Sequence, residues 1–242
     1  MTRVVISQPM YLPWVGFLAQ MALADVFIWL DDVQFSKGSY TNRIQVKTPT
    51  GSKWMSIPLK EKGSFKNIFE LASVGNSWIK SHRGLLSQSL RGRLHTASAI
   101  SIFDRVAETD STLCDKLIVS AEALAKHLDI LPCNVLKASN LNIKGNSWSR
   151  VLELVKSVSG TEYITGHGAL GYLDHDAFES QGITVRYMDY DPLPWPQPFD
   201  AFTPYVTGLD FVASLGAAEA KCHLRPASID WRTFISLREK PL

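Results

Sequence analysis

The chain has 242 residues, 45% of them hydrophobic and 20% charged, as is typical of a globular protein with an ordinary core. Its net charge of +2 provides no strong field for nucleic acid or membrane lipid, so we expect neither as a partner. Apolar stretches without charge reach only about ten residues, too short for insertion across a bilayer. Three widely spaced cysteines and the lack of a signal-peptide pattern predict a cytoplasmic protein with reduced thiols.

The first predicted elements follow one another in the order of a βαβ unit. Arg3–Ile6 and Val26–Leu30 are short apolar runs that predict buried strands, and Val15–Ala24 between them has helical spacing. Such a unit predicts a parallel sheet, in which ligands bind beyond the carboxyl ends of the strands. The proline-stiffened loop Ser7–Trp14 and the pair Asp31–Asp32 are both expected at such ends.

The segment that follows has the alternation of an antiparallel hairpin. Gln34–Lys60 alternates apolar and polar residues around a turn at Pro49–Gly51. Further helices are expected over Ser77–Leu90, Ser101–Asp104, Thr109–Leu128, Trp148–Ser157, Asp174–Gln181 and Val206–Gly216. A strand and loop are expected over Ile130–Ser139, and further strands over Tyr163–Thr165 and Thr184–Asp189. We therefore predict one α/β domain over residues 1–242, with a parallel, Rossmann-like sheet and with residues 34–90 as a hairpin and helical insertion.

Candidate binding and catalytic groups follow the first two strands. Gln8, Tyr11 and Trp14 offer donors, acceptors and a stacking face, and the helix start beside them favours an anion. A packed aromatic turn is the competing interpretation. Asp32 could act as a general base or bind Mg²⁺, unless it only caps a turn. Neighbouring residues of a strand point in opposite directions, so we expect only one of Asp31 and Asp32 at the site.

Other candidates lie outside the βαβ unit. Asn42 and Arg43 on the hairpin could hold a hydroxyl and a phosphate, although surface residues would look the same. His82, on a predicted helix, is the best placed of the six histidines for a general base, with a structural role as the alternative. Gly166 lies in a glycine-flanked loop that could cradle a phosphate, and Gln197 in an aromatic loop that could wall a sugar pocket. No Cys/His cluster has the spacing of a zinc site, and no residue is predicted as a metal ligand from spacing alone.

These stretches together resemble the WbqC-like protein family over nearly the whole chain. The resemblance is carried by Gln8-Pro9, Tyr11-Leu12-Pro13-Trp14, Gly16-Phe17, Ala24-Asp25-Val26-Phe27, Leu30-Asp31-Asp32-Val33-Gln34-Phe35, Asn42-Arg43, Trp54, Ile57-Pro58, Trp78, His82 and, further on, Tyr172-Leu173-Asp174, Gly182-Ile183, Gln197 and Asp210. Ser7 stands where the family usually has a histidine. The resemblance implies a bacterial, cytoplasmic transferase of surface-polysaccharide biosynthesis (O-antigen, lipopolysaccharide), which adds an acyl or aminoacyl group to a nucleotide-activated amino sugar.

A narrower likeness is to nucleotidyltransferase-like α/β domains. It rests on the order of strand, loop, helix and strand, and on the Asn146–Arg150 stretch that opens a later helix. Those domains carry histidines in the first loop, which this chain lacks. Three hypotheses stay open: an amide-forming enzyme, a non-catalytic binding or scaffold protein, and a nucleotidyltransferase. A nucleotide sugar is the expected substrate, while ATP, acyl-CoA and Mg²⁺ stay open as cofactors, as does the oligomeric state.

Overall fold

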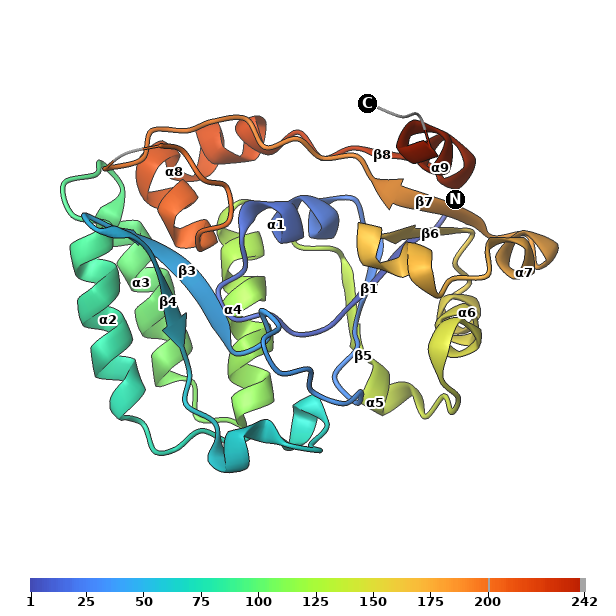
Figure 1. The fold of residues 1–242 in the computed structure, drawn as a ribbon, viewed down its shortest axis with the longest axis horizontal. Helices are drawn as coiled ribbons and strands as arrows, with labels where there is room; N and C mark the ends of the chain where they lie inside the picture. Colours follow the sequence, from blue (N-terminus) through green and yellow to red (C-terminus); the bar gives the residue numbers. More distant parts are fainter. Residues whose placement is uncertain (200, 240–242) are drawn as a thin grey trace.

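A computed structural model describes residues 1–199 and 201–239; residue 200 and residues 240–242 of the predicted domain lie outside the described residues. At its centre is a six-stranded sheet in the order β5-β2-β1-β6-β7-β8 (Figure 1). The strands are β1 (Arg3–Ser7), β2 (Val26–Trp29), β5 (Asn134–Lys137), β6 (Glu162–Thr165), β7 (Thr184–Met188) and β8 (Ser228–Asp230). All neighbours are parallel except β7 and β8. The predicted parallel, Rossmann-like sheet is confirmed.

The central strands are buried on both faces. Val4 and Val5 are both fully buried, yet they belong to two separate hydrophobic cores. The core of Val5 includes residues of α1 (Val15–Ala22), α4 (Leu113–His127) and α8 (Gly208–Leu224), and that of Val4 includes residues of α6 (Ser147–Ser157), α7 (His175–Ser180) and α9 (Trp231–Glu239). Figure 1 shows these two groups of helices on opposite sides of the sheet. Because both faces are covered, the strands are apolar runs without polar alternation.

The strand order reverses between β1 and β6. From β1 the sheet extends through β2 to β5 on one side, and through β6 and β7 to β8 on the other. Val5 of β1 is in register with Phe27 of β2 and with Ile164 of β6. In open α/β sheets, ligands bind in the crevice outside the carboxyl ends of the strands at such a reversal. The segments that follow Ser7 and Thr165 therefore border the expected ligand position.

The predicted hairpin is also present. β3 (Arg43–Thr48) and β4 (Gly51–Ser56) are antiparallel and form a separate two-stranded sheet, which packs against α2 (Ser77–Ser89). Two short 3₁₀ turns, η1 (Lys60–Gly63) and η2 (Ile68–Glu70), follow β4. The chain rejoins the large sheet at β5 only after α3 (Thr96–Glu108) and α4, so its excursion from the sheet continues beyond the predicted range 34–90.

The helix predicted over Ser101–Asp104 is much longer in the structure. α3 extends over Thr96–Glu108 and buries Ala99, Ile102 and Val106. These residues have the spacing of one helix face, so the sequence contained the signal for the longer helix. Neither β8 nor α9 is predicted from the sequence. β8 is a three-residue edge strand, which is too short to show a periodic pattern.

The last long helix, α8, is bent at Gly216 (φ 73°, ψ 177°). A Cβ atom at this position would lie 2.8 Å from Nε2 of His95, and a positive φ is strained for any other residue. Glycine is therefore required both by the backbone and by the packed imidazole. The predicted helix Val206–Gly216 ends at this bend, whereas α8 continues to Leu224.

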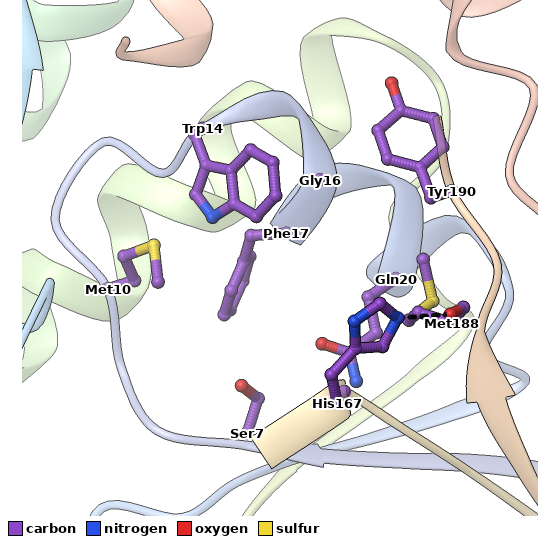
Figure 2. A pocket seen from close by; sticks show the side chains of 10 residues that line it. Ser7, Met10, Trp14, Gly16, Phe17, Gln20, His167, Met188 and Tyr190 are labelled. Carbon is purple, nitrogen blue, oxygen red and sulfur yellow. Dashed lines mark hydrogen bonds between the residues drawn. The ribbon is translucent and has the colours of Figure 1, made fainter. Parts of the chain in front are cut away.

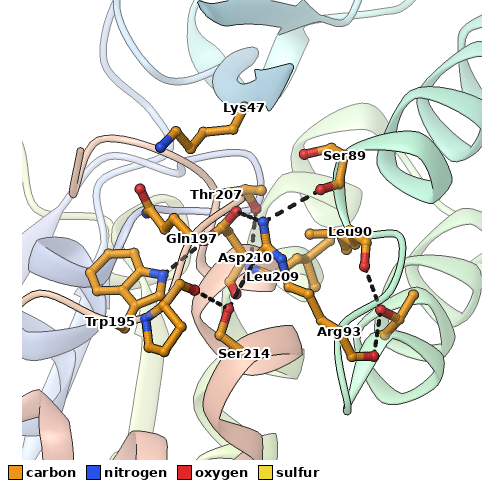
Figure 3. A network of polar contacts seen from close by, with 12 residues as sticks. Lys47, Ser89, Leu90, Arg93, Trp195, Gln197, Thr207, Leu209, Asp210 and Ser214 are labelled. Atoms are coloured by element: carbon orange, nitrogen blue, oxygen red, sulfur yellow. Dashed lines mark hydrogen bonds and ion pairs between the residues drawn. The ribbon is translucent and has the colours of Figure 1, made fainter. Parts of the chain in front are cut away.

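A buried ion pair joins α8 to the turn between α2 and α3 (Figure 3). Arg93 Nη2 donates to Oδ2 of Asp210 at 2.6 Å, and the two side chains are 8% and 1% exposed. Trp195 Nε1 donates to the other carboxylate oxygen at 2.8 Å, and Arg93 Nη1 donates to Ser214 Oγ at 3.1 Å. The network therefore ties the proline-rich loop before α8 to the helical layer.

Two features are absent from the part of the chain that the structure describes. No helix there is long and apolar enough to cross a membrane. Nor do three or more His, Cys, Asp or Glu side chains gather there in a group that could hold a metal ion.

Candidate functional site

Two cavities open beside the carboxyl end of β1. The first, the aromatic cavity, has a volume of about 350 Å³ (Figure 2) and is lined by Ser7, Met10, Trp14, Gly16, Phe17, Gln20, Gly166, His167, Met188 and Tyr190. The second, the Arg150 cavity, has a volume of about 460 Å³ and is lined by Gln8, Leu30, Asp32, Val33, Gln34, Gly145, Asn146, Ser147, Arg150, Val151, Leu154 and Tyr172. Ser7 and Gln8 are consecutive but line different cavities, so the two cavities flank one strand end at the reversal of strand order.

Aromatic rings form one wall of the aromatic cavity. Trp14 precedes α1, and its indole lies directly over Gly16, where a Cβ atom would come within 2.1 Å of the ring. The absence of a side chain at Gly16 is therefore what allows the indole to cover the helix start. Tyr205 packs against Trp14 with ring centroids 5.4 Å apart. Figure 2 shows Trp14 and Phe17 across the cavity from His167.

His167 is held in one tautomer. Its Nε2 lies 2.8 Å from the carbonyl oxygen of Met188, which only accepts hydrogen bonds, so Nε2 carries the proton. Its Nδ1 lies 2.8 Å from Nη2 of Arg238, which only donates, so Nδ1 is the acceptor. The Arg238 guanidinium, on α9, also lies 4.4 Å over the ring of Phe234. The imidazole is therefore a fixed ring whose two nitrogens are both hydrogen-bonded within the protein.

The Arg150 cavity is lined by an ion pair in which one carboxylate oxygen makes no hydrogen bond to the described residues. Arg150 donates through Nη2 to Oδ2 of Asp32 at 2.5 Å and through Nε to the carbonyl of Ile143 at 2.9 Å. The other carboxylate oxygen of Asp32, Oδ1, is buried without a hydrogen-bond partner among the described residues. Asn146 precedes α6 and its side chain does not cap the helix, so the first amides of α6 are left available. A buried carboxylate oxygen without a donor is costly unless a ligand supplies one.

Of the two neighbouring aspartates, which follow the end of β2, Asp32 lines the Arg150 cavity and Asp31 lines neither of the two cavities. Asp31 is 2% exposed. It accepts hydrogen bonds from the backbone nitrogen of Ser139 at 3.0 Å and from its hydroxyl at 2.7 Å. Asp31 therefore anchors the start of α5 (Ala138–Leu141) to the end of β2.

Two of the predicted site residues, Tyr11 and His82, form a buried pair elsewhere. The Tyr11 hydroxyl lies 3.0 Å from Nδ1 of His82, and Nε2 of His82 lies 3.2 Å from the carbonyl oxygen of Ser56. That carbonyl only accepts, so Nε2 carries the proton and Tyr11 donates to Nδ1. Trp78 packs edge-on against Tyr11. The pair joins the loop after β1 to the hairpin and α2, and it lines neither cavity.

Burial lowers the pKa of His82 from 6.5 to about 4, partly opposed by its hydrogen bond to Ser56. The unfolded chain therefore binds this proton at a higher pH than the folded chain, and stability is lost as pH falls from about 6.5 to about 4. We expect His82→Gln to remove roughly 2–3 kcal/mol of the stability difference between pH 7 and pH 4.5. Urea unfolding of both proteins at the two pH values measures this stability difference. If His82→Gln left the difference unchanged, the buried His82 would not be its cause.

Three further predicted residues, Asn42, Arg43 and Gln197, make hydrogen bonds to backbone groups of the protein. Arg43 donates to the carbonyls of Ser39 and Gly38, and its guanidinium lies 4.1 Å over the ring of Trp54. Asn42 Nδ2 donates to the carbonyl of Ile57 at 2.9 Å, which joins the two ends of the hairpin.

Gln197 has a comparable place in the proline-rich loop. Its side-chain amide bonds both the backbone nitrogen and the carbonyl of Thr203, at 3.1 and 2.9 Å, and so closes the loop. Gln197, Asn42 and Arg43 line neither cavity, and their functional roles stay predictions.

Comparison with known proteins assigns the chain to a family. The model of the WbqC-like protein family matches residues 8–222. The chain belongs to the WbqC-like protein family. The uncharacterized protein Rv1507c of Mycobacterium tuberculosis is similar to it, with 29% identity over 231 residues that cover 93% of this chain and 98% of the relative. No solved structure matches the chain.

In this WbqC-like chain the structure brings four predicted site residues to the cavities. Gln8 and Asp32 line the Arg150 cavity, and Trp14 and Gly166 line the aromatic cavity. Their functional roles also stay predictions. Gln8, Trp14 and Asp32 come from the two strand ends and the helix start of the βαβ unit, and Gly166 follows β6, the next parallel strand beside β1.

Sequence reasoning assigned no role to three residues that the WbqC-like fold places at the cavities: Gln20, Arg150 and His167. Arg150 and His167 each had a signal, because one ends the Asn146–Arg150 stretch at a helix start and the other follows Gly166. Gln20 had none, since a glutamine in the middle of a helix is usually a surface residue.

Proposed function

We propose that this protein is a cytoplasmic enzyme of surface-polysaccharide biosynthesis that forms an amide on a nucleotide-activated amino sugar by acyl or aminoacyl transfer. The family resemblance suggests the substrate class. The observation that carries the proposal is the buried, unpaired Oδ1 atom of Asp32, a residue that lines the cavity beside Arg150 at the reversal of strand order. A carboxylate oxygen without a donor is suited to accept a hydrogen bond from a sugar amine.

The same cavity offers groups for a phosphate. Arg150 keeps Nη1 without a hydrogen bond among the described residues, and α6 presents its uncapped amino end beside it. A helix amino end and a guanidinium both favour anions. We therefore assign phosphate binding to Arg150 in preference to Arg43, whose guanidinium is bonded to Ser39 and Gly38 and stacked on Trp54.

Asp32 would supply the acid–base step. The amine attacks the carbonyl carbon of the donor, the new C–N bond forms, and the bond from that carbon to the leaving group breaks. The amine cannot complete the attack while it keeps its proton, so Oδ1 of Asp32 takes that proton and passes it to the leaving group. We assign this role to Asp32 in preference to His82, since both nitrogens of His82 are bonded within the protein. Gln8, which lines the same cavity, would orient the sugar.

The test combines ligand binding with product detection. Purified protein is screened by thermal shift against nucleotide sugars with an amine or a hydroxyl at the same carbon, with ATP and with acyl-CoA, each with and without Mg²⁺. At about 100 times Kd, a ligand of the folded state adds about 2.7 kcal/mol, which raises Tm by roughly 5–10 °C in a chain of this size. Binding partners are then combined and the products weighed by mass spectrometry.

The expected product is an amide on the amino sugar, and none on its hydroxyl counterpart. The donor that supports it decides between acyl-CoA and ATP-dependent chemistry. Pyrophosphate release from a nucleoside triphosphate without amide formation would favour the nucleotidyltransferase hypothesis instead. No shift and no product with any compound would favour the scaffold hypothesis.

A further inference from the structure

The proposed chemistry leaves the aromatic cavity unused. None of its lining residues is Asp, Glu, Lys or Arg. Its imidazole keeps no free nitrogen, because His167 is bonded to Met188 and Arg238. By contrast, the side chains of Ser7 and Gln20 make no hydrogen bonds to the described residues, and Figure 2 shows the Gln20 amide beside the His167 ring. The cavity is thus lined by aromatic and uncharged side chains, and its lining includes the Gln20 amide and the Ser7 hydroxyl without hydrogen-bond partners among the described residues.

We infer that the aromatic cavity binds a nucleobase and that Gln20 reads its polar edge. The inference deepens the proposed function, because it takes the base to belong to the nucleotide part of the same substrate. A base is planar and uncharged at neutral pH, and it stacks on aromatic rings such as those of Trp14 and Phe17. Its edge carries both donors and acceptors, and the primary amide of Gln20 offers one group of each kind.

A plain aliphatic acyl chain fits these observations less well. It would leave the Gln20 amide and the Ser7 hydroxyl without partners in an apolar space, which costs free energy. A base would satisfy both groups. The wall opposite Trp14 is also rigid, since His167 is fixed from two sides, and a rigid slot suits a planar ring.

The positions of the two cavities agree with one ligand that passes over the end of β1. Ser7 lines the aromatic cavity and Gln8 lines the Arg150 cavity, and the Cα atoms of consecutive residues are only about 3.8 Å apart. A base beside Ser7 would thus leave its phosphates near Arg150 and its sugar near Asp32. This is the crevice in which open α/β sheets bind their ligands.

The test uses uridine, thymidine, cytidine, guanosine and adenosine as probes of the base alone, and ribose 5-phosphate as the matched ligand without a base. Affinities are measured by calorimetry for the wild type, for Gln20→Leu and for Gln20→Glu. Gln88→Leu is the control, because Gln88 is an exposed glutamine on α2 that lines neither cavity. Each variant is first compared with the wild type by its Tm.

We expect at least one nucleoside to bind, with Kd raised about tenfold in Gln20→Leu, as expected for one lost hydrogen bond. Gln20→Glu should weaken the same nucleoside, because a carboxylate keeps the acceptor and loses the donor. Gln88→Leu should bind as the wild type does, and ribose 5-phosphate should be insensitive to Gln20.

Two results would overturn the inference: no nucleoside binds, or both Gln20 variants bind nucleosides as the wild type does. The two proposals can fail separately. Nucleoside binding that depends on Gln20, without an amide product from any donor, would support the base site and reject the transferase. An amide formed on a base-free amino-sugar phosphate, when no nucleoside binds, would reject the base site and support the transferase.

Discussion

Replacing Asp210 with alanine should destabilise the fold by about 3–5 kcal/mol, because it would leave the charge of Arg93 buried without its partner. The ion pair is 2.6 Å long and its side chains are 8% and 1% exposed. The same change removes the acceptor of the buried Trp195 indole. At about 2–4 °C per kcal/mol for a chain of this size, Tm should fall by roughly 6–20 °C. Urea unfolding and scanning calorimetry at pH 7 measure the two quantities.

A double variant separates the ion pair from simple loss of packing. Arg93→Met combined with Asp210→Leu replaces both charges by apolar groups and should be more stable than Asp210→Ala alone. Asp104→Ala is the surface control, because Asp104 pairs with an exposed arginine, Arg83, and its loss should change Tm little. A double variant as unstable as Asp210→Ala would show that the buried charge of Arg93 is not the cause.

The second large effect is expected on catalysis. Under the proposed mechanism, Asp32→Asn should lower kcat by about 10²–10⁴, the usual contribution of a general base. Asparagine keeps the shape of the side chain and an oxygen for Arg150, but it cannot take up the amine proton. KM for the nucleotide sugar should change much less, because Arg150 and α6 remain to bind the phosphates. Steady-state kinetics of amide formation measure both constants.

Asp31→Asn is the matched control for that experiment. Asp31 is the neighbouring aspartate, but it is bonded to Ser139 and lines neither cavity. We expect this variant to lose stability while it keeps kcat per folded molecule near that of the wild type. Wild-type kcat in Asp32→Asn, with the folded fraction verified by circular dichroism, would remove Asp32 from the mechanism.

Local pattern was enough to predict the frame of the molecule. The apolar runs around Val5 and Phe27, separated by one amphipathic helix, predict the parallel sheet, and the turn at Pro49–Gly51 predicts the hairpin. These elements depend on the period of apolar residues over a few turns or strand positions, which is a local property. The same pattern placed Gln8 and Asp32 at strand ends and Trp14 at a helix start, where the cavities are found.

Tertiary contacts decided which polar residues are free. On sequence grounds Asp31 and Asp32 are alike, yet Ser139, more than a hundred positions away, bonds one of them and Arg150 pairs with the other. His82 is a good candidate base until Tyr11 and Ser56 are found on its two nitrogens.

The sequence by itself thus determined the class of fold, the family and the edge of the sheet at which to look for a ligand. Only the tertiary structure decided that Arg150 and Gln20 face that edge while Arg43 and His82 are bonded elsewhere. The physical reason is that periodicity fixes the direction of a side chain within its own element. Whether that side chain meets a partner or an open cavity depends on residues distant in the chain, brought close only by packing.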